Sequence, residues 1–319
     1  MFGFVFRLLV VLPLAKQELH ELVTTQQLSM ASYIADEIDQ KVRTRQETLE
    51  RIAGSYPHES GNDPSVIEAW LSRVQTLSPF FLSGMMIVLK DGTLRASNTP
   101  ASTTAHHDAL FTETQWLLSI LNSGGPQISP PFKDPDQNTA MIAFGIGIRD
   151  QSGAVTAVLV GLTQLDAAGF LQELNTQKWG NGGSYLIISP HDQMFLGAND
   201  PSFIMKRTPK PGINLLHDKA MAGYRGPGVT VNAQGVEEVV GIQSVPSTGW
   251  FVVSRIPVEK AYAPIDTIAW PYSFLMYFAG STVLHKRLAT WHRGENLYMP
   301  CPKMEKTKPV HWSGSSTCW

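Results

Sequence analysis

The sequence is poor in cysteine and in charge, and both shortages narrow the possible functions. Its 319 residues include only two cysteines, Cys301 and Cys318, so the body of the chain has neither a disulfide framework nor a thiolate metal cluster. Charged residues make up 16% of the sequence, against about 25% in an average soluble domain. The formal charge of -2 lacks the basic excess of nucleic-acid-binding domains, so no nucleic-acid partner is predicted.

The sequence also lacks the patterns that mark common catalytic sites. It contains no HExxH, GxSxG, Walker A or GxGxxG motif. No Asp, Glu or Cys stands at a ligand spacing with both His106 and His107, which favours a solvated pair over a metal site. Turn formation beside Gly, Pro or Ser explains most of the aspartates that suggest acid–base chemistry, namely Asp91, Asp134, Asp136 and Asp150. We therefore expect no catalysis, no metal and no cofactor.

Two apolar stretches lie near the ends of the chain. Residues 1–15 are interrupted only by Arg7 and Pro13, and residues 267–284 form an uncharged run of 18 residues that includes Trp270. We interpret both as transmembrane helices, the first of them truncated, because about 20 apolar residues span a bilayer. A signal-peptide core for the first stretch and a buried core helix for the second are the alternatives.

The residues after the second stretch predict its orientation. His285, Lys286 and Arg287 follow directly, and such a basic cluster is typical of the cytoplasmic side. Residues 16–266 then lie outside the inner membrane, as a periplasmic or extracellular region. Residues 285–319 form a cytoplasmic tail that is too short for an enzymatic domain and has the character of a truncated or out-of-frame segment.

The region between these stretches changes from helical to strand periodicity. Apolar residues recur in steps of three, four or seven from Gln17 to Tyr56 and predict one long amphipathic helix, and Ser65 to Leu77 predicts a second. Asp91-Gly92 is the strongest hairpin signal among the strands that follow. A similar order of strands and helices occurs twice, which predicts an α+β fold of two modules whose helices cover one face of antiparallel sheets. The predicted strands are 84–89, 93–97, 139–148, 154–162, 184–188, 193–197, 229–232, 237–245 and 250–256, and the shorter helices are 108–121, 164–175, 214–222 and 258–265.

The strand from Thr139 to Ile148 is the most informative segment for binding. Its alternate residues form two faces. One face is bulky (Ile142, Phe144, Ile146, Ile148) and the other mostly small (Met141, Ala143, Gly145, Gly147). Small side chains leave room close to the backbone, either for a ligand or for tight packing of the long helix.

A ligand pocket on the small face is the sharper of these two interpretations. Arg95 and Ser97 on the hairpin strand would add polar contacts, and Phe132 would act as a lid. An exposed strand charge at Arg95 and ordinary loop packing of Phe132 are the alternatives. The predicted ligand-binding residues are Arg95, Ser97, Phe132, Met141, Ala143 and Gly145.

Residues 16–266 resemble the double Cache family of bacterial extracellular sensors. The resemblance rests on the order of the long initial helix and the segments GMMIVLKDGTLRASN, MIAFGIGIRDQSGAVTAVLVGLTQL, GSYLIISPHDQMFLGA and GWFVVSRIPVEKAYAPI. It implies two tandem PAS-like modules, a distal one at about 57–163 and a membrane-proximal one at about 176–257, with flanking transmembrane helices. It also implies that the distal module holds a small ligand. Apart from Trp116, the common amino-acid-binding signature is absent, so no amino-acid ligand is predicted.

The resemblance further implies a function. The chain is expected to be the small-ligand sensing region of a bacterial transmembrane receptor, similar to those of membrane diguanylate cyclases and acting as a homodimer. It would carry no catalytic domain of its own, while the parent receptor would be a diguanylate cyclase, a histidine kinase or a chemotaxis protein. A truncated membrane diguanylate cyclase that lacks its GGDEF output and a periplasmic binding protein are the alternatives.

Overall fold

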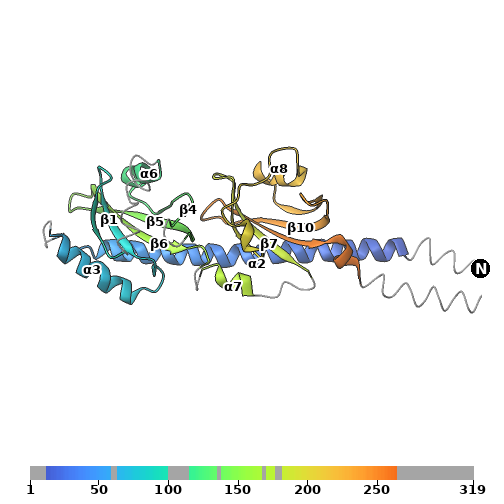
Figure 1. Ribbon diagram of the computed structural model, residues 1–319, viewed down its shortest axis with the longest axis horizontal. Coiled ribbons are helices and arrows are strands. Elements are labelled where there is room, and N and C mark those ends of the chain that lie inside the picture. The colour runs from blue at the N-terminus through green and yellow to red at the C-terminus, as the bar shows by residue number, and fades with distance from the viewer. Residues whose placement is uncertain are drawn as a thin grey trace, which may run out of the picture. The chain divides into compact units, whose positions relative to one another are not determined.

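The fold is organised around one long helix. The computed structural model describes residues 12–58, 63–99, 115–134, 138–166, 170–176 and 182–263. Helix α2 (Leu12–Gly54) has 43 residues, which gives a length of about 65 Å at 1.5 Å per residue. Figure 1 shows it running along both sheets. The predicted long helix is confirmed, with an earlier start at Leu12 and an end at Gly54. One stripe along it is fully buried, comprising Ile34, Ile38, Val42 and Leu49.

The two predicted membrane segments lie almost entirely outside the described residues. Only residues 12–15 of the first segment are described, as the start of α2, while residues 267–284 and the tail from 285 to 319 are not. Within the described ranges, no helix combines the length and the apolar character that crossing a bilayer requires. Both membrane segments therefore stay predictions from the sequence.

The first sheet follows the helix α3 (Pro64–Leu77) and is antiparallel throughout. Its elements are β1 (Met85–Leu89), β2 (Leu94–Ser97), α6 (Gln115–Ser123), β3 (Gln127–Ile128), β4 (Phe132–Lys133), β5 (Ala140–Arg149) and β6 (Val155–Gln164). The strand order is β2-β1-β6-β5-β3, and β4 also pairs with β5. The ten-residue strands β5 and β6 form the longest pair. Strands β1 and β2 lie on the β6 side of this pair, and β3 and β4 lie on the β5 side.

The second sheet is also antiparallel and has five strands. Its elements are α7 (Gln172–Thr176), β7 (Ser184–Ser189), β8 (Met194–Ala198), the 3-10 helix η3 (Pro201–Phe203), α8 (Leu215–Met221), β9 (Gly226–Val231), β10 (Glu237–Ser244) and β11 (Phe251–Pro257). The strand order is β8-β7-β11-β10-β9. Residues 258–263 are helical and directly follow β11.

Each sheet has an inner face, which packs against α2, and an outer face, which a short helix covers. The inner face of the first sheet contributes Ile142 and Phe144 to the core that contains α2, and the inner face of the second contributes Ile187 and Val252. Figure 1 shows α6 and α8 on the opposite side of the sheets from α2. Each module therefore has two apolar layers, one on each side of its sheet.

Helix α2 approaches the inner face of the second sheet very closely at one glycine. A Cβ atom at Gly241 on β10 would collide with the backbone of Gln27 and Leu28 on α2. Next to this contact, the buried Ser254 hydroxyl donates a hydrogen bond of 2.7 Å to the Gln27 Oε1 atom. Only glycine allows this approach, because any side chain would push the helix away from the sheet.

The predicted α+β architecture with two antiparallel sheets is confirmed, and three local predictions need correction. The helix predicted over 164–175 begins too early, because β6 extends to Gln164 by pairing with Met141, and among the described residues of this range the helix is α7. Strands β3 and β4 were not predicted, since two residues each are too short to show a period. Helices cover both faces of each sheet rather than one. Residues 108–114 of the helix predicted over 108–121 lie outside the described residues.

Candidate functional site

The small side chains predicted to border a pocket lie on the outer face of the first sheet. Met141 and Ala143 are buried there in a cluster with Trp116 and Ile120 of α6. A Cβ atom at Gly145 would lie 2.6 Å from the Ile120 Cδ1 atom and 2.8 Å from the Trp116 Cζ2 atom. The small residues thus let α6 lie close to the sheet, and the alternative that the long helix packs on this face is wrong.

The other predicted site residues are spread across the same sheet. Phe132 on β4 pairs in register with Met141 and packs on the outer-face cluster. Ser97 on β2 lies at the far edge, three strands from β5, which corresponds to about 14 Å. Its hydroxyl is 2.5 Å from the Thr99 Oγ1 atom in a local turn. Arg95 is half-buried on β2, where the ladder with β1 is irregular. The structure therefore brings Phe132, Met141, Ala143 and Gly145 together, but not Arg95 and Ser97 with them.

The outer face of the second sheet contains a cavity of about 90 Å³ beside α8. Its wall has an apolar part, with Leu186, Ile188, Leu216 and Val240 among its members. The polar part includes Asn214, His217, Thr230, Asn232, Glu238 and Arg255. A cavity with one apolar and one polar end is the usual form of a small-molecule site.

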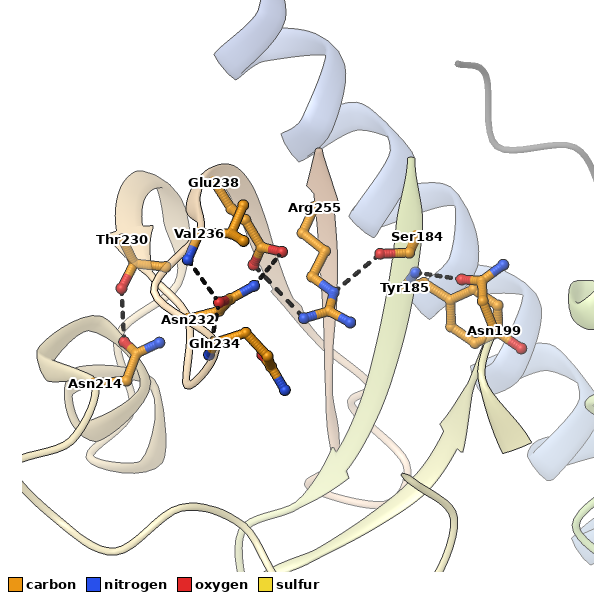
Figure 2. A network of polar contacts seen from close by, with 10 residues as sticks. All are labelled: Ser184, Tyr185, Asn199, Asn214, Thr230, Asn232, Gln234, Val236, Glu238 and Arg255. Carbon is orange, nitrogen blue, oxygen red and sulfur yellow. Dashed lines mark hydrogen bonds and ion pairs between the residues drawn. The ribbon is translucent and has the colours of Figure 1, made fainter. Parts of the chain in front are cut away.

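An ion pair forms the polar end of this cavity (Figure 2). Glu238 on β10 lies diagonally across the ladder from Arg255 on β11, since Val240 is the residue directly opposite Arg255. Their atoms Oε2 and Nη1 are 3.5 Å apart, and their side chains are 8% and 18% exposed. The Arg255 Nε atom donates to the Ser184 hydroxyl on β7 at 2.9 Å. The pair thereby links three neighbouring strands.

Two asparagines fix the loops that surround the pair (Figure 2). The Asn232 Nδ2 atom donates to Glu238 Oε1 at 2.9 Å, while its Oδ1 atom accepts from the backbone of Gln234 and Val236. Asn214 is the N-cap of α8. Its Oδ1 atom accepts from the backbone of Leu216 and His217 and from the Thr230 hydroxyl at 2.7 Å. The polar groups of the cavity are therefore held in place by the backbone around them.

His217 lines the cavity from α8, and burial disfavours its protonated form. Burial lowers its pKa below the usual value, while the neighbouring Asp218 acts in the opposite direction. Its Nε2 atom is buried and forms no hydrogen bond among the described residues. Among these residues, no group of three His, Cys, Asp or Glu side chains is arranged to hold a metal ion. The polar side chains that line the cavity offer hydrogen-bond donors, hydrogen-bond acceptors and one charge of each sign.

Sequence reasoning did not predict this cavity, although one signal points to it. In the predicted strand 237–245, alternate residues place Glu238 on the same face as Val240 and Ile242. A carboxylate on an apolar strand face needs a partner, because an unpaired charge is costly to bury. Arg255 occupies the corresponding position beside Val253 on the adjacent strand.

The sequence and the fold were compared with known proteins. Residues 14–265 match the family model dCache_1, described as a Cache domain. The ligand-binding domain of the Pseudomonas aeruginosa PAO1 chemoreceptor PctB in complex with L-Arg is 18% identical, with a TM-score of 0.56 over 76% of this chain and 98% of that one. No curated protein matches the sequence.

Two further solved structures have the same fold. The sensory domain of the Campylobacter jejuni chemoreceptor Tlp3 is 12% identical, with a TM-score of 0.59 over 78% of this chain and 99% of that one. The ligand-binding domain of the Pseudomonas fluorescens chemoreceptor CtaA, in complex with L-isoleucine, is 16% identical, with a TM-score of 0.54 over 80% and 98%. At these identities, the comparison with solved structures establishes the fold alone.

Proposed function

The chain belongs to the Cache domain family, and on that premise we propose that it is the extracytoplasmic, small-ligand sensing region of a bacterial transmembrane signalling receptor. Cache domains are non-catalytic ligand-binding modules of membrane receptors. The chain would act by binding a ligand and passing a conformational change through the membrane, with no reaction of its own. In this proposal residues 267–284 cross the inner membrane and residues 16–266 lie in the periplasm or outside the cell.

The observation that carries this proposal is that both sheets pack on the same helix. The apolar core around α2 is continuous from Ile146 and Ile148 in the first sheet to Ile187 and Val252 in the second. A ligand that changes the outer face of either sheet would alter the packing of its inner face on α2. Such a ligand shifts the receptor between conformations only if it binds one of them better.

The two segments that would lead towards the membrane contact each other. Val23 on α2 packs with Val239 and with Ala261 of the helical segment 258–263. The His20 Nδ1 atom lies 2.6 Å from the Tyr262 hydroxyl oxygen. A movement of α2 would therefore be transmitted directly to the chain that continues after β11. This contact supports a signalling role for the pair of segments.

Exposed apolar side chains on α2 support the proposal of a homodimer. Leu22 is 64% exposed and Tyr33 is 53% exposed, although both lie on a helix whose other side is buried. Such a surface suits a second copy of the same helix. Analytical ultracentrifugation of the full-length chain in detergent should give a dimer that Leu22→Glu and Tyr33→Glu together dissociate.

For the ligand of the distal module, we propose the outer face of the first sheet, close to Phe132, Met141 and Ala143. A thermal-shift screen of the full-length chain against amino acids, organic acids, amines and nucleobases should give a stabilising ligand. Ala143→Leu adds bulk on this face and should abolish its binding. Ile142→Leu on the inner face is the matched control and should preserve it. A ligand that binds the Ala143→Leu variant as tightly as the wild type would contradict this location.

The membrane topology is tested separately. Protease added to spheroplasts should digest residues 16–266, because they are proposed to lie outside the inner membrane. Complete protection of this region would contradict the proposed location.

A further inference from the structure

We propose that the cavity on the outer face of the second sheet is a second ligand-binding site, for a small net-neutral molecule with a short apolar body and a head group that both donates and accepts hydrogen bonds. A primary carboxamide is the simplest molecule of this class. The proposal goes beyond the sensing role above, because it assigns a site to the module that is not expected to hold the ligand. It rests on the charges, the hydrogen-bonding capacity and the size of the cavity.

The polar end has hydrogen-bonding capacity that the protein leaves unused. Glu238 Oε1 accepts from Asn232, but Glu238 Oε2 lies 3.5 Å from the Arg255 Nη1 atom, longer than an N–H···O hydrogen bond of about 2.7–3.2 Å. Among the described residues, Arg255 donates a hydrogen bond only from Nε, to Ser184. A head group that donates to Oε2 and accepts from an Nη atom would satisfy both partners. Because both groups are largely buried, satisfying them matters more than it would at the surface.

The opposite charges of this pair select against ligands that carry a net charge. A cation near Glu238 would also lie near Arg255 and be repelled by it, and an anion near Arg255 would be repelled by Glu238. A neutral head with a donor and an acceptor interacts favourably with both. The remaining polar groups agree with this choice, since burial disfavours the protonated form of His217 and Asn214 is uncharged.

The size and the wall of the cavity limit the rest of the ligand. The cavity volume is about 90 Å³, several times the minimum of about 10–15 Å³ that lets a cavity hold one water molecule. This limits the ligand to a small molecule, such as a four-carbon primary amide. Leu186, Ile188, Leu216 and Val240 provide the apolar wall for that chain.

Hydrogen bonds within the chain hold the polar residues of the site in place. Asn214 and Asn232 use their Oδ1 atoms on backbone N–H groups, which fixes the start of α8 and the turn between β9 and β10. Ser184 holds the Arg255 guanidinium from the adjacent strand. A preorganised site loses little conformational entropy on binding.

The test uses three probes of nearly equal size: butyramide, butyrate and butylammonium. Their binding to the full-length chain is measured at neutral pH by calorimetry and by saturation-transfer NMR at up to about 50 mM. Butyramide should bind at least about tenfold more tightly than either charged probe. The absence of butyramide binding, or equal or tighter binding of a charged probe, would overturn the proposal.

Variants of the ion pair should reverse the preference in opposite directions. Glu238→Gln leaves Arg255 as the charge at the site, so butyrate should become the preferred probe. Arg255→Gln leaves Glu238, so butylammonium should become the preferred probe. Glu237→Gln is the matched control, because Glu237 is the exposed neighbour on the same strand and should not change the ranking. An unchanged preference for butyramide in both pair variants, or loss of binding of all three probes in both, would contradict the charge complementarity assigned to the pair.

A last variant separates this site from the pocket proposed on the first sheet. Ala143→Leu should leave butyramide binding unchanged, because Ala143 lies in the outer-face cluster of the other sheet. If Ala143→Leu abolishes butyramide binding, the probe occupies the first sheet and the second site does not exist. If butyramide binding survives but no ligand for the first sheet is found, the second site stands and the distal pocket fails.

Discussion

The two sheets use their inner faces alike and their outer faces differently. Both inner faces are apolar and pack on α2. On the outer face of the first sheet, α6 lies directly over Gly145, and Trp116 and Ile120 fill the space. On the outer face of the second sheet, Glu238 and Arg255 interrupt the apolar surface and a cavity is left beside α8. The comparison indicates that the shared helix constrains the inner faces, while the outer faces are free to differ in their packing.

The first prediction contrasts helix packing on an inner and an outer face, and it has the largest expected effect. Gly241→Ala places a Cβ atom against the rigid backbone of α2, so we expect a loss of about 3 kcal/mol or more in the free energy of unfolding. Gly145→Ala meets the side chains of Ile120 and Trp116, which can move, and should cost about 1–2 kcal/mol.

Denaturant unfolding of the full-length chain measures both losses. Gly54→Ala at the end of α2 is the control, because no atom outside its chain neighbours and its own helix backbone lies within 4 Å of its Cβ position. It should not lower the free energy of unfolding, since alanine is the better helix former. If Gly145→Ala costs more than Gly241→Ala, the contact of α2 with the second sheet is less rigid than the structure indicates.

The second prediction concerns the buried arginine on α2 between the two sheets. Arg45 is 1% exposed, and its guanidinium lies 4.6 Å from the Phe170 ring centroid and 5.3 Å from that of Phe80. Burial lowers its pKa to about 10, while Glu173 acts in the opposite direction, so Arg45 stays charged at neutral pH. Arg45→Ala removes the cation–π contacts and leaves a cavity, which should cost about 2–3 kcal/mol.

A second arginine on the same helix provides the control for Arg45. Arg43 forms an ion pair of 2.7 Å with Asp39, but its side chain is 58% exposed. Arg43→Ala should therefore cost less than about 0.5 kcal/mol. Equal losses for the two variants, measured by denaturant unfolding, would show that the aromatic contacts of Arg45 contribute little to the junction between the sheets.

Much of this architecture is visible in the sequence, because it follows from regular periods. The buried stripe of α2 repeats in helical steps, and β5 alternates between bulky and small residues, so both were predicted within a few residues. What fills the small face was not predictable. The nearness of Trp116 to Gly145 depends on how the chain returns after β2, and a period within one strand does not contain that information.

The two candidate sites also depend on information that the period of a single strand does not contain. Glu238 and Arg255 are 17 positions apart in the sequence, and only the register of β10 with β11 brings them together. Arg95 and Ser97 were predicted to add polar contacts to the pocket on β5, and the structure places β1 and β6 between their strand and β5. Strand register in the first case and strand order in the second are thus the missing information.

The third prediction compares the caps of one helix in each module. Asn214 caps α8 and accepts hydrogen bonds from two backbone N–H groups and from Thr230. The Asp63 side chain caps α3 in an exposed position, and its partners among the described residues are the backbone N–H and the hydroxyl of Ser65. Asn214→Ala should cost about 1–2 kcal/mol and Asp63→Ala about 0.5–1 kcal/mol. Both losses are read from denaturant unfolding, and a larger loss for Asp63→Ala would contradict the structural role assigned to Asn214.

The last prediction has the smallest effect and concerns the pH dependence of the second module. Burial lowers the pKa of His217 in the folded chain below the unfolded value of about 6.5, so the unfolded chain binds more protons as the pH falls. The stabilisation by neutral His217 is complete above this value and is lost as the pH falls through it towards the folded pKa. Asp218 beside His217, and Glu238 and Arg255 in the same cavity, are the charged groups nearby.

Since the glutamine of His217→Gln cannot be protonated in this pH range, this variant should flatten the decline in stability between neutral pH and mildly acidic pH. His191→Gln is the control, because the His191 side chain is 92% exposed and should leave the decline unchanged. Denaturant midpoints of the three proteins across this pH range give the answer, and an unchanged decline in His217→Gln would show that His217 is solvated in the folded chain.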